Sequence, residues 1–177
     1  MADIARLVGC SVGALYSRFR DKEALFASAV EVTMSQEVEA LRVRAQAGRY
    51  VDLSLRDSVD LCVKDFRGFV VGHRAMIRAI YQRSGEQPEY WGIVRGATFD
   101  MVQVWIEAIS RAAGRADRAF IRQVGIAFQF VSSSLVHAVL IDKQARPLSE
   151  REQVFWLDEM VMHFISLDVP EALRGTQ

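Results

Sequence analysis

Residues that break helices or turn strands are scarce in this sequence. Only 3 prolines and 11 glycines occur among 177 residues, too few for the many tight turns of a β-sandwich. The sequence also has no alternating β-branched runs, internal repeats or low-complexity tracts. Apolar residues form 51% of the chain, which is enough to build a core and argues against disorder. We expect one large domain or two small ones.

Net charge, a cysteine framework and a secretion signal are missing as well. The 22 basic and 22 acidic residues cancel, so any contact with nucleic acid must come from a local patch. Cys10 and Cys62 lie far apart and form no paired-cysteine motif, which argues against a disulfide scaffold and a zinc site. The first residues lack the basic-then-apolar order of a signal peptide, so we expect a cytoplasmic protein.

The stretch 123–141 carries no formally charged residue over 19 positions, close to the ~20 that span a bilayer. Its polar interruptions are Gln123, Gln129, Ser132, Ser133, Ser134 and His137. Each of these side chains would need a hydrogen-bonding partner inside hydrocarbon. We therefore expect a helix buried on several sides in a soluble protein, and no membrane partner.

Breaks in the chain separate long segments whose apolar residues have helical spacing. The breaks fall at Gly9, 20–21, Gly48, 72–73, 84–88, Gly114 and 146–147. The capping signals are Asp21 before a helix over 22–47, Ser54 with Asp57, and Ser149 with Glu152. The sequence predicts an all-α fold.

The start of the chain predicts two short helices, over 2–8 and 12–19, joined by a tight turn. Ala5 is small where the helices would cross, and Leu15 would point into the crossing. Gly9 can take the positive φ of a turn residue. Ser11 can accept a hydrogen bond from the first amides of the second helix. Together these features indicate a helix-turn-helix.

This pattern resembles the DNA-reading head of the TetR (tetracycline-repressor) family of bacterial transcription regulators. The resembling residues are Ile4-Ala5, Gly9-Cys10-Ser11, Gly13-Ala14-Leu15-Tyr16, Phe19 and Lys22-Glu23-Ala24-Leu25-Phe26. The resemblance implies a DNA-binding head over 1–26 and a helical effector-binding and dimerisation domain over 27–177. It also implies a first helix, of about 15 to 20 residues, before the two predicted here. Since Met1 falls just before the second helix of such a head, the sequence either is shortened or lacks that helix. We expect the former, because the rest of the head is complete.

A recognition helix inserts its N-terminal end into the major groove, where residues must be small or able to reach base edges. Small residues stand at this end, and we expect Ser11, Val12, Gly13 and Ala14 to meet DNA. Val12 and Ala14 could contact thymine methyl groups. Gly13 permits close approach of the backbone, unless it is only a tolerated small residue.

The resemblance implies that Tyr16 and Lys22 contact phosphates. Arg18 could pair with a guanine, bind phosphate or remain a solvated arginine, and Ser17 is a weak candidate. The first 22 residues hold four basic and two acidic side chains, a modest excess that a dimer would double. We expect Phe19 to be a core residue that holds the recognition helix against the next helix.

Catalytic and metal-binding patterns are missing from the sequence. The three histidines form no His-Glu-x-x-His motif, and Ser132–Ser134 lack the Gly-x-Ser-x-Gly elbow of a hydrolase. Glu159 and His163 are one turn apart, which suits a hydrogen-bonded histidine better than a metal site. We expect no enzyme, metal site or cofactor.

Trp91, Thr98 and Trp105 recur every seven residues on one predicted helix face. Such a stripe is core in many proteins, whereas the resemblance favours an effector site among the middle helices. The candidate lining residues are Phe66, Val70, His73, Met76, Tyr81, Trp91, Thr98, Met101, Trp105 and Phe128. Few paired charges occur on these faces, so we expect a small, largely apolar effector.

The resulting hypothesis is a homodimeric regulator, a repressor, that binds a palindromic operator and is released by its effector. Apolar residues surround the helices predicted over 118–141 and 150–167, which favours dimerisation through these last two helices. Ala127 and Phe130 are among the residues expected at that interface. The alternative is a helical ligand-binding or scaffolding dimer that has lost DNA binding.

Overall fold

The computed structural model describes residues 1–85, 89–141 and 148–168, and within these ranges every regular element is an α-helix. The helices are α1 (Ala2–Val8), α2 (Val12–Arg18), α3 (Lys22–Gln46), α4 (Leu55–Gly72), α5 (Arg74–Arg83), α6 (Glu89–Ala113), α7 (Arg118–Leu140) and α8 (Glu150–Ser166). The predicted all-α fold is confirmed.

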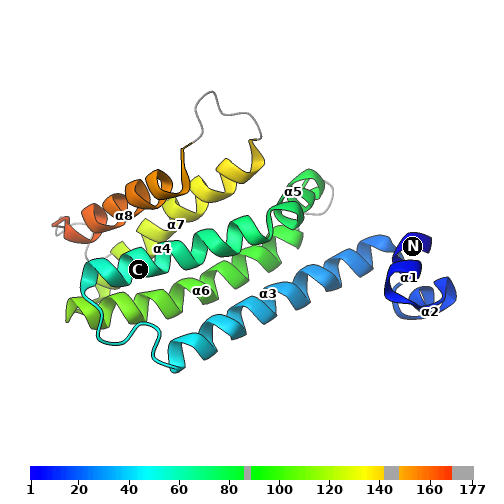
Figure 1. The fold of residues 1–177 in the computed structure, drawn as a ribbon, viewed down its shortest axis with the longest axis horizontal. Coiled ribbons are helices and arrows are strands. Elements are labelled where there is room, and N and C mark those ends of the chain that lie inside the picture. The colour runs from blue at the N-terminus through cyan, green and yellow to red at the C-terminus, as the bar shows by residue number, and fades with distance from the viewer. Residues whose placement is uncertain (86–88, 142–147, 169–177) are drawn as a thin grey trace.

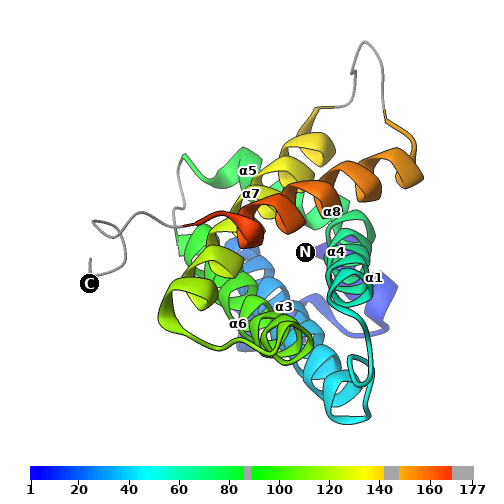
Figure 2. The same ribbon diagram turned by 90° about the vertical axis from the view of Figure 1, so that its left-hand side faces the viewer.

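A small head formed by α1 and α2 lies at one end of the molecule, and α3 connects it to a bundle of the other helices (Figure 1). Within the bundle α3 packs along α6, and α4 packs against α6, α7 and α8. Helix α8 lies across α4 and α7, and the short α5 packs against α7. Figure 2, viewed from the left side of Figure 1, shows α8 covering one side of the bundle, away from α3.

Capping residues explain where the helices begin. Asp21, Ser54 and Asp117 each accept a backbone N–H from the first turn of the helix that follows. The predicted capping box of Ser149 and Glu152 is complete, since each residue bonds the backbone N–H of the other. The predicted breaks coincide with helix ends, although 86–88 and 146–147 lie outside the described residues.

Trp105 is at the centre of the bundle core. Its ring lies between Phe66 and Phe128, with both centroid distances 5.2 Å. Its indole N–H donates to the hydroxyl of Tyr50 at 3.2 Å, and that hydroxyl donates to Asp65 at 2.5 Å. The buried indole therefore keeps a hydrogen-bonding partner while contributing a large apolar surface to the core.

Helix α7 is the one described helix that is long and apolar enough to cross a membrane by length and composition. In this fold it packs against α4, α5, α6 and α8. Val124, Phe128 and Val131 are fully buried among those helices. Its place in the bundle thus accounts for the apolar residues on its buried side.

A buried carboxyl group lies between α4 and α8. Asp158 is only 8% exposed, and one of its oxygens has no hydrogen-bonding partner in the described protein. Burial, reinforced by the nearby carboxylate of Asp60, raises the pKa of Asp158 to about 7. Lys64 offsets part of this effect, and it also bonds Asp60 at 2.7 Å. Asp158 therefore favours its neutral form in the folded protein below about pH 7.

We expect Asp158 to make the protein less stable as pH rises. The native state holds a proton that the unfolded state releases near its ordinary pKa, so the stabilisation is lost between about pH 4 and pH 7. Asp158→Asn, which imitates the neutral acid, should match the wild type at about pH 4, before this loss begins. At pH 8 it should be more stable by roughly 1–3 kcal/mol. Urea denaturation at both values measures this difference, with the exposed Glu107→Gln as control. An unchanged pH dependence in Asp158→Asn contradicts the assignment.

Candidate functional site

The head is built around one tight crossing of two helices. Helix α1 ends at Gly9, whose φ of 70° is the left-handed conformation that glycine adopts without strain. The backbone N–H of Cys10 then bonds the carbonyl of Ala5 at 3.0 Å. Ala5 and Leu15 are buried where the helices meet. The predicted helix-turn-helix is confirmed.

Ser11 starts the second helix, because its Oγ accepts the N–H of Ala14 at 3.1 Å. Helix α2 then exposes every residue except Leu15. All the residues expected to meet DNA are exposed on α2, its cap and the start of α3: Ser11, Val12, Gly13, Ala14, Tyr16, Ser17, Arg18 and Lys22. The structure therefore gathers them at one end of the molecule (Figure 1).

Ion pairing divides the basic residues of the head into two groups. Arg6 pairs with Asp3 at 2.6 Å, and Arg20 pairs with Asp21 at 2.9 Å. Arg18 and Lys22 form no ion pair within the part of the chain that the structure describes. The uncompensated positive charge thus lies at the end of α2 and the start of α3, where an anionic backbone can approach.

Two side chains of the head depart from simple expectations. Ser17 donates its hydroxyl proton to the carbonyl of Ala14 at 2.9 Å, so a DNA contact from it must use the oxygen as acceptor. Phe19, expected in the core, is only half-buried and lies outside the bundle core. The backbone at Phe19 is extended between α2 and α3, and the length of α3 keeps this segment away from the bundle (Figure 1).

A cluster at the start of α3 attaches the head to the bundle, and we call Glu23, Phe26, Arg83 and Tyr90 the head clamp. The hydroxyl of Tyr90 lies 3.1 Å from a carboxylate oxygen of Glu23, and Arg83 lies 3.3 Å from the same oxygen. The guanidinium of Arg83 covers the ring of Phe26 at 4.8 Å, and the ring of Tyr90 meets Phe26 edge-on at 5.3 Å. Two ionic or polar contacts and two aromatic contacts therefore fix the first turns of α3 on α5 and α6.

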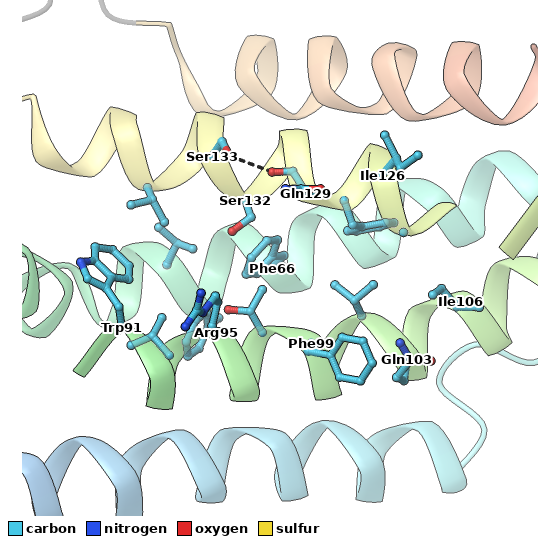
Figure 3. A pocket seen from close by; sticks show the side chains of 18 of the residues that line it. Phe66, Trp91, Arg95, Phe99, Gln103, Ile106, Ile126, Gln129, Ser132 and Ser133 are labelled. Atoms are coloured by element: carbon cyan, nitrogen blue, oxygen red, sulfur yellow. Dashed lines mark hydrogen bonds between the residues drawn. The ribbon is translucent and has the colours of Figure 1, made fainter. Parts of the chain in front are cut away.

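A cavity of about 610 Å³ opens between α4, α5, α6 and α7. Figure 3 shows side chains from α6 and α7 facing one another across it. Five of the expected lining residues lie on its wall: Phe66, Val70, Trp91, Thr98 and Phe128. This volume suits a small organic ligand.

Five other expected residues lie elsewhere. His73, Met101 and Trp105 line a separate cavity of about 400 Å³ between α3, α4 and α6. Met76 and Tyr81 line neither cavity, because α5 turns Ile77 and Ile80 toward the first one instead. Every one of these α5 positions is apolar or aromatic, so periodicity alone does not fix which side of the helix faces inward.

The sequence analysis missed most of the polar part of the first cavity. Besides Thr98 and Gln129, its wall holds Arg95, Gln103, Arg122, Ser132 and Ser133. A usable signal was present, since Arg95 is four residues after Trp91 and three before Thr98, on the same helix face. A search for apolar lining residues alone does not find this arginine.

The geometry of the head defines a helix-turn-helix DNA-binding protein, and comparison with known families agrees. Residues 1–29 match the family model described as bacterial regulatory proteins, tetR family. Neither the curated proteins nor the solved structures gave a match to this chain. This match of the head supports a DNA-binding transcription regulator of the tetR type.

Separate effects on DNA affinity and DNA preference are expected from two kinds of substitution in the head. Tyr16→Ala and Lys22→Ala remove the side chains expected to contact phosphates, so each should weaken binding to all sequences alike. Lys22→Ala should also reduce the number of counterions released on DNA binding by about one, as measured from the salt dependence of the affinity. Arg18→Ala should relax the preference at one base position instead.

Binding by the full protein to an operator selected from random DNA, and to unrelated DNA, measures both effects. Arg6→Ala is the control, since Arg6 is already paired with Asp3 on α1. Unchanged affinity in the Tyr16 and Lys22 variants at physiological salt contradicts the phosphate roles.

Proposed function

We propose that this DNA-binding regulator is a ligand-responsive homodimeric repressor of the cytoplasm. Residues 1–26 bind a palindromic operator, and the domain over 27–177 binds a small effector with a largely apolar body. The observation that carries the proposal is the position of Trp91 and Tyr90. Trp91 lines the first cavity, and the adjacent Tyr90 holds the head through Glu23.

Coupling between cavity and head follows from this arrangement. A ligand that shifts the first turn of α6 displaces Trp91 and Tyr90 together, because they are consecutive residues of one helix. Displacing Tyr90 weakens the contacts that fix Glu23 and Phe26 at the start of α3. The effector then favours a state in which the two heads of a dimer no longer match successive major grooves.

Exposed aromatic residues on α7 and α8 support dimerisation through these helices. Phe130 is 52% exposed on α7 and contacts Phe164 of α8, with the two rings tilted and their centroids 5.3 Å apart. Trp156 is 60% exposed on α8, next to the exposed Phe155. Ala127, expected at the same interface, is instead fully buried in the bundle, on the face shared with Val124 and Val131. Pairing α7 and α8 with their copies would cover the exposed rings in a four-helix interface.

The alternative function, a ligand-binding dimer without DNA binding, has one observation in its favour. Ala5 and Leu15 are the buried apolar residues of α1 and α2, so the head has little core of its own. Measuring DNA binding separates the two functions, since the alternative predicts none at physiological salt.

Filling the first cavity should abolish the ligand response and leave DNA binding intact. The neutral dye N-phenyl-1-naphthylamine should bind the wild type, quench Trp91 and weaken binding to the operator. Gly125 lines the cavity, and a Cβ atom added there meets only Ile106, in ordinary contact at 4.0 Å. Gly125→Leu should lower dye affinity at least tenfold, because its side chain occupies the ligand's space.

Gly96→Leu is the matched control, since Gly96 is exposed on α6 and has open space around it. Dye fluorescence and operator binding are measured on both variants. Equal dye affinity in Gly125→Leu and the wild type would show that the dye binds elsewhere, against the proposed site.

Dimerisation should depend on the exposed rings of α7 and α8. The wild type should be a dimer at micromolar concentration by light scattering. Phe130→Glu and Trp156→Glu should give monomers, because each places a charge in an apolar interface. Val32→Glu, at an exposed position on α3, should remain a dimer. A monomeric wild type excludes the homodimer.

A further inference from the structure

The first cavity has a one-sided distribution of charge. Arg95 and Arg122 are its charged lining residues, and no aspartate or glutamate lies among the described residues of the wall. The other polar groups on the wall are the neutral side chains of glutamine, serine and threonine residues. The wall therefore favours a negative group on any ligand.

Arg95 has no competing partner. It makes no ion pair or side-chain hydrogen bond across residues 1–85, 89–141 and 148–168. Figure 3 shows its side chain extending from α6 toward α7, with the hydroxyl of Ser132 directed into the same space. Ser132 likewise has no hydrogen bond in the described protein, whereas the neighbouring Ser133 donates to the carbonyl of Gln129 at 2.9 Å. A guanidinium and a hydroxyl thus face one part of the cavity with their donors unused.

The inner part of the cavity has the opposite character. Phe66, Val70, Ile80 and Phe128 are buried on its wall. Arg95 itself is exposed, which places it at the mouth, near the exposed ring of Phe99. A ligand that fills the cavity has an apolar body inside and can keep a polar group near solvent.

We propose that the effector is an amphipathic monoanion whose carboxylate or sulfonate pairs with Arg95 and accepts a hydrogen bond from Ser132. This inference rests on the proposed function, because it specifies the ligand of the same cavity. A charge at the mouth keeps part of its hydration, so its desolvation is limited, while the guanidinium provides charge-assisted hydrogen bonds. The expected preference for the anion is roughly 5- to 30-fold over a neutral ligand of the same shape.

Two dyes with the same ring framework test the preference. 8-Anilino-1-naphthalenesulfonate carries an anionic group, and N-phenyl-1-naphthylamine lacks it. We expect the wild type to bind the sulfonate more tightly, and dodecanoate to compete for the cavity better than 1-dodecanol. Arg95→Met should lower the ratio of sulfonate to neutral dye affinity at least fivefold, because it keeps a flexible apolar stem and removes the charge.

Arg95→Lys should restore part of the ratio, and Arg111→Met, at an exposed position of α6 outside the cavity, should leave it unchanged. Ser132→Ala should lower the ratio of sulfonate to neutral dye affinity by a smaller factor than Arg95→Met. If the neutral dye binds in the cavity and the ratio is the same in wild type and Arg95→Met, the anion inference is wrong and the proposed function stands. If neither dye responds to Gly125→Leu, ligand binding in this cavity fails, and both proposals fall with it.

Discussion

The structure depends on α3 belonging to two parts of the protein. Its middle buries one stripe against α6, formed by Val30, Met34, Val38 and Leu41. Its first turns carry the head, whose own helices bury little apolar surface. Hydrophobic stabilisation follows the apolar area removed from water. The head is therefore held in place mainly by the apolar surface that α3 buries against the bundle. The orientation of the head is set by the position of α3 relative to α6.

Opposite faces of helix α6 pack against different helices. Met101 and Trp105 face α3 and α4, where the second cavity lies, whereas Arg95 and Thr98 face the first cavity and α7. A ligand between α6 and α7 therefore acts on the same helix that supports α3. Under the proposed function, such a ligand changes DNA affinity only as far as it binds the two orientations of α6 differently. A closely packed helix is barely compressible, so a displacement of one part of α6 moves the rest of the helix with it.

The parts of the fold that depend on local chemistry could be predicted from the sequence, and the parts that depend on tertiary contacts could not. Asp21, Ser54 and Ser149 identified helix starts because a cap bonds residues three positions away. The inward face of α5 was not predictable, since several of its sides are apolar and only packing selects one. The hydrogen bond from Trp105 to Tyr50 joins residues 55 positions apart, with no local pattern to reveal it. Arg95 was overlooked because a cavity wall tolerates polar residues that a closed core excludes.

The two cavities differ in what a ligand would have to displace. In the second cavity Arg49 holds Asp65 through two hydrogen bonds, and His73 lies 3.0 Å from Glu37. A ligand that broke the first pair would leave Asp65, which is 13% exposed, with an uncompensated charge. The first cavity imposes no such cost at Arg95, whose donors have no partner in the described protein. A ligand in the first cavity breaks no existing ion pair at Arg95, so the first cavity fits the proposed effector site better, and the paired charges of the second link α3 and the loop after it to α4.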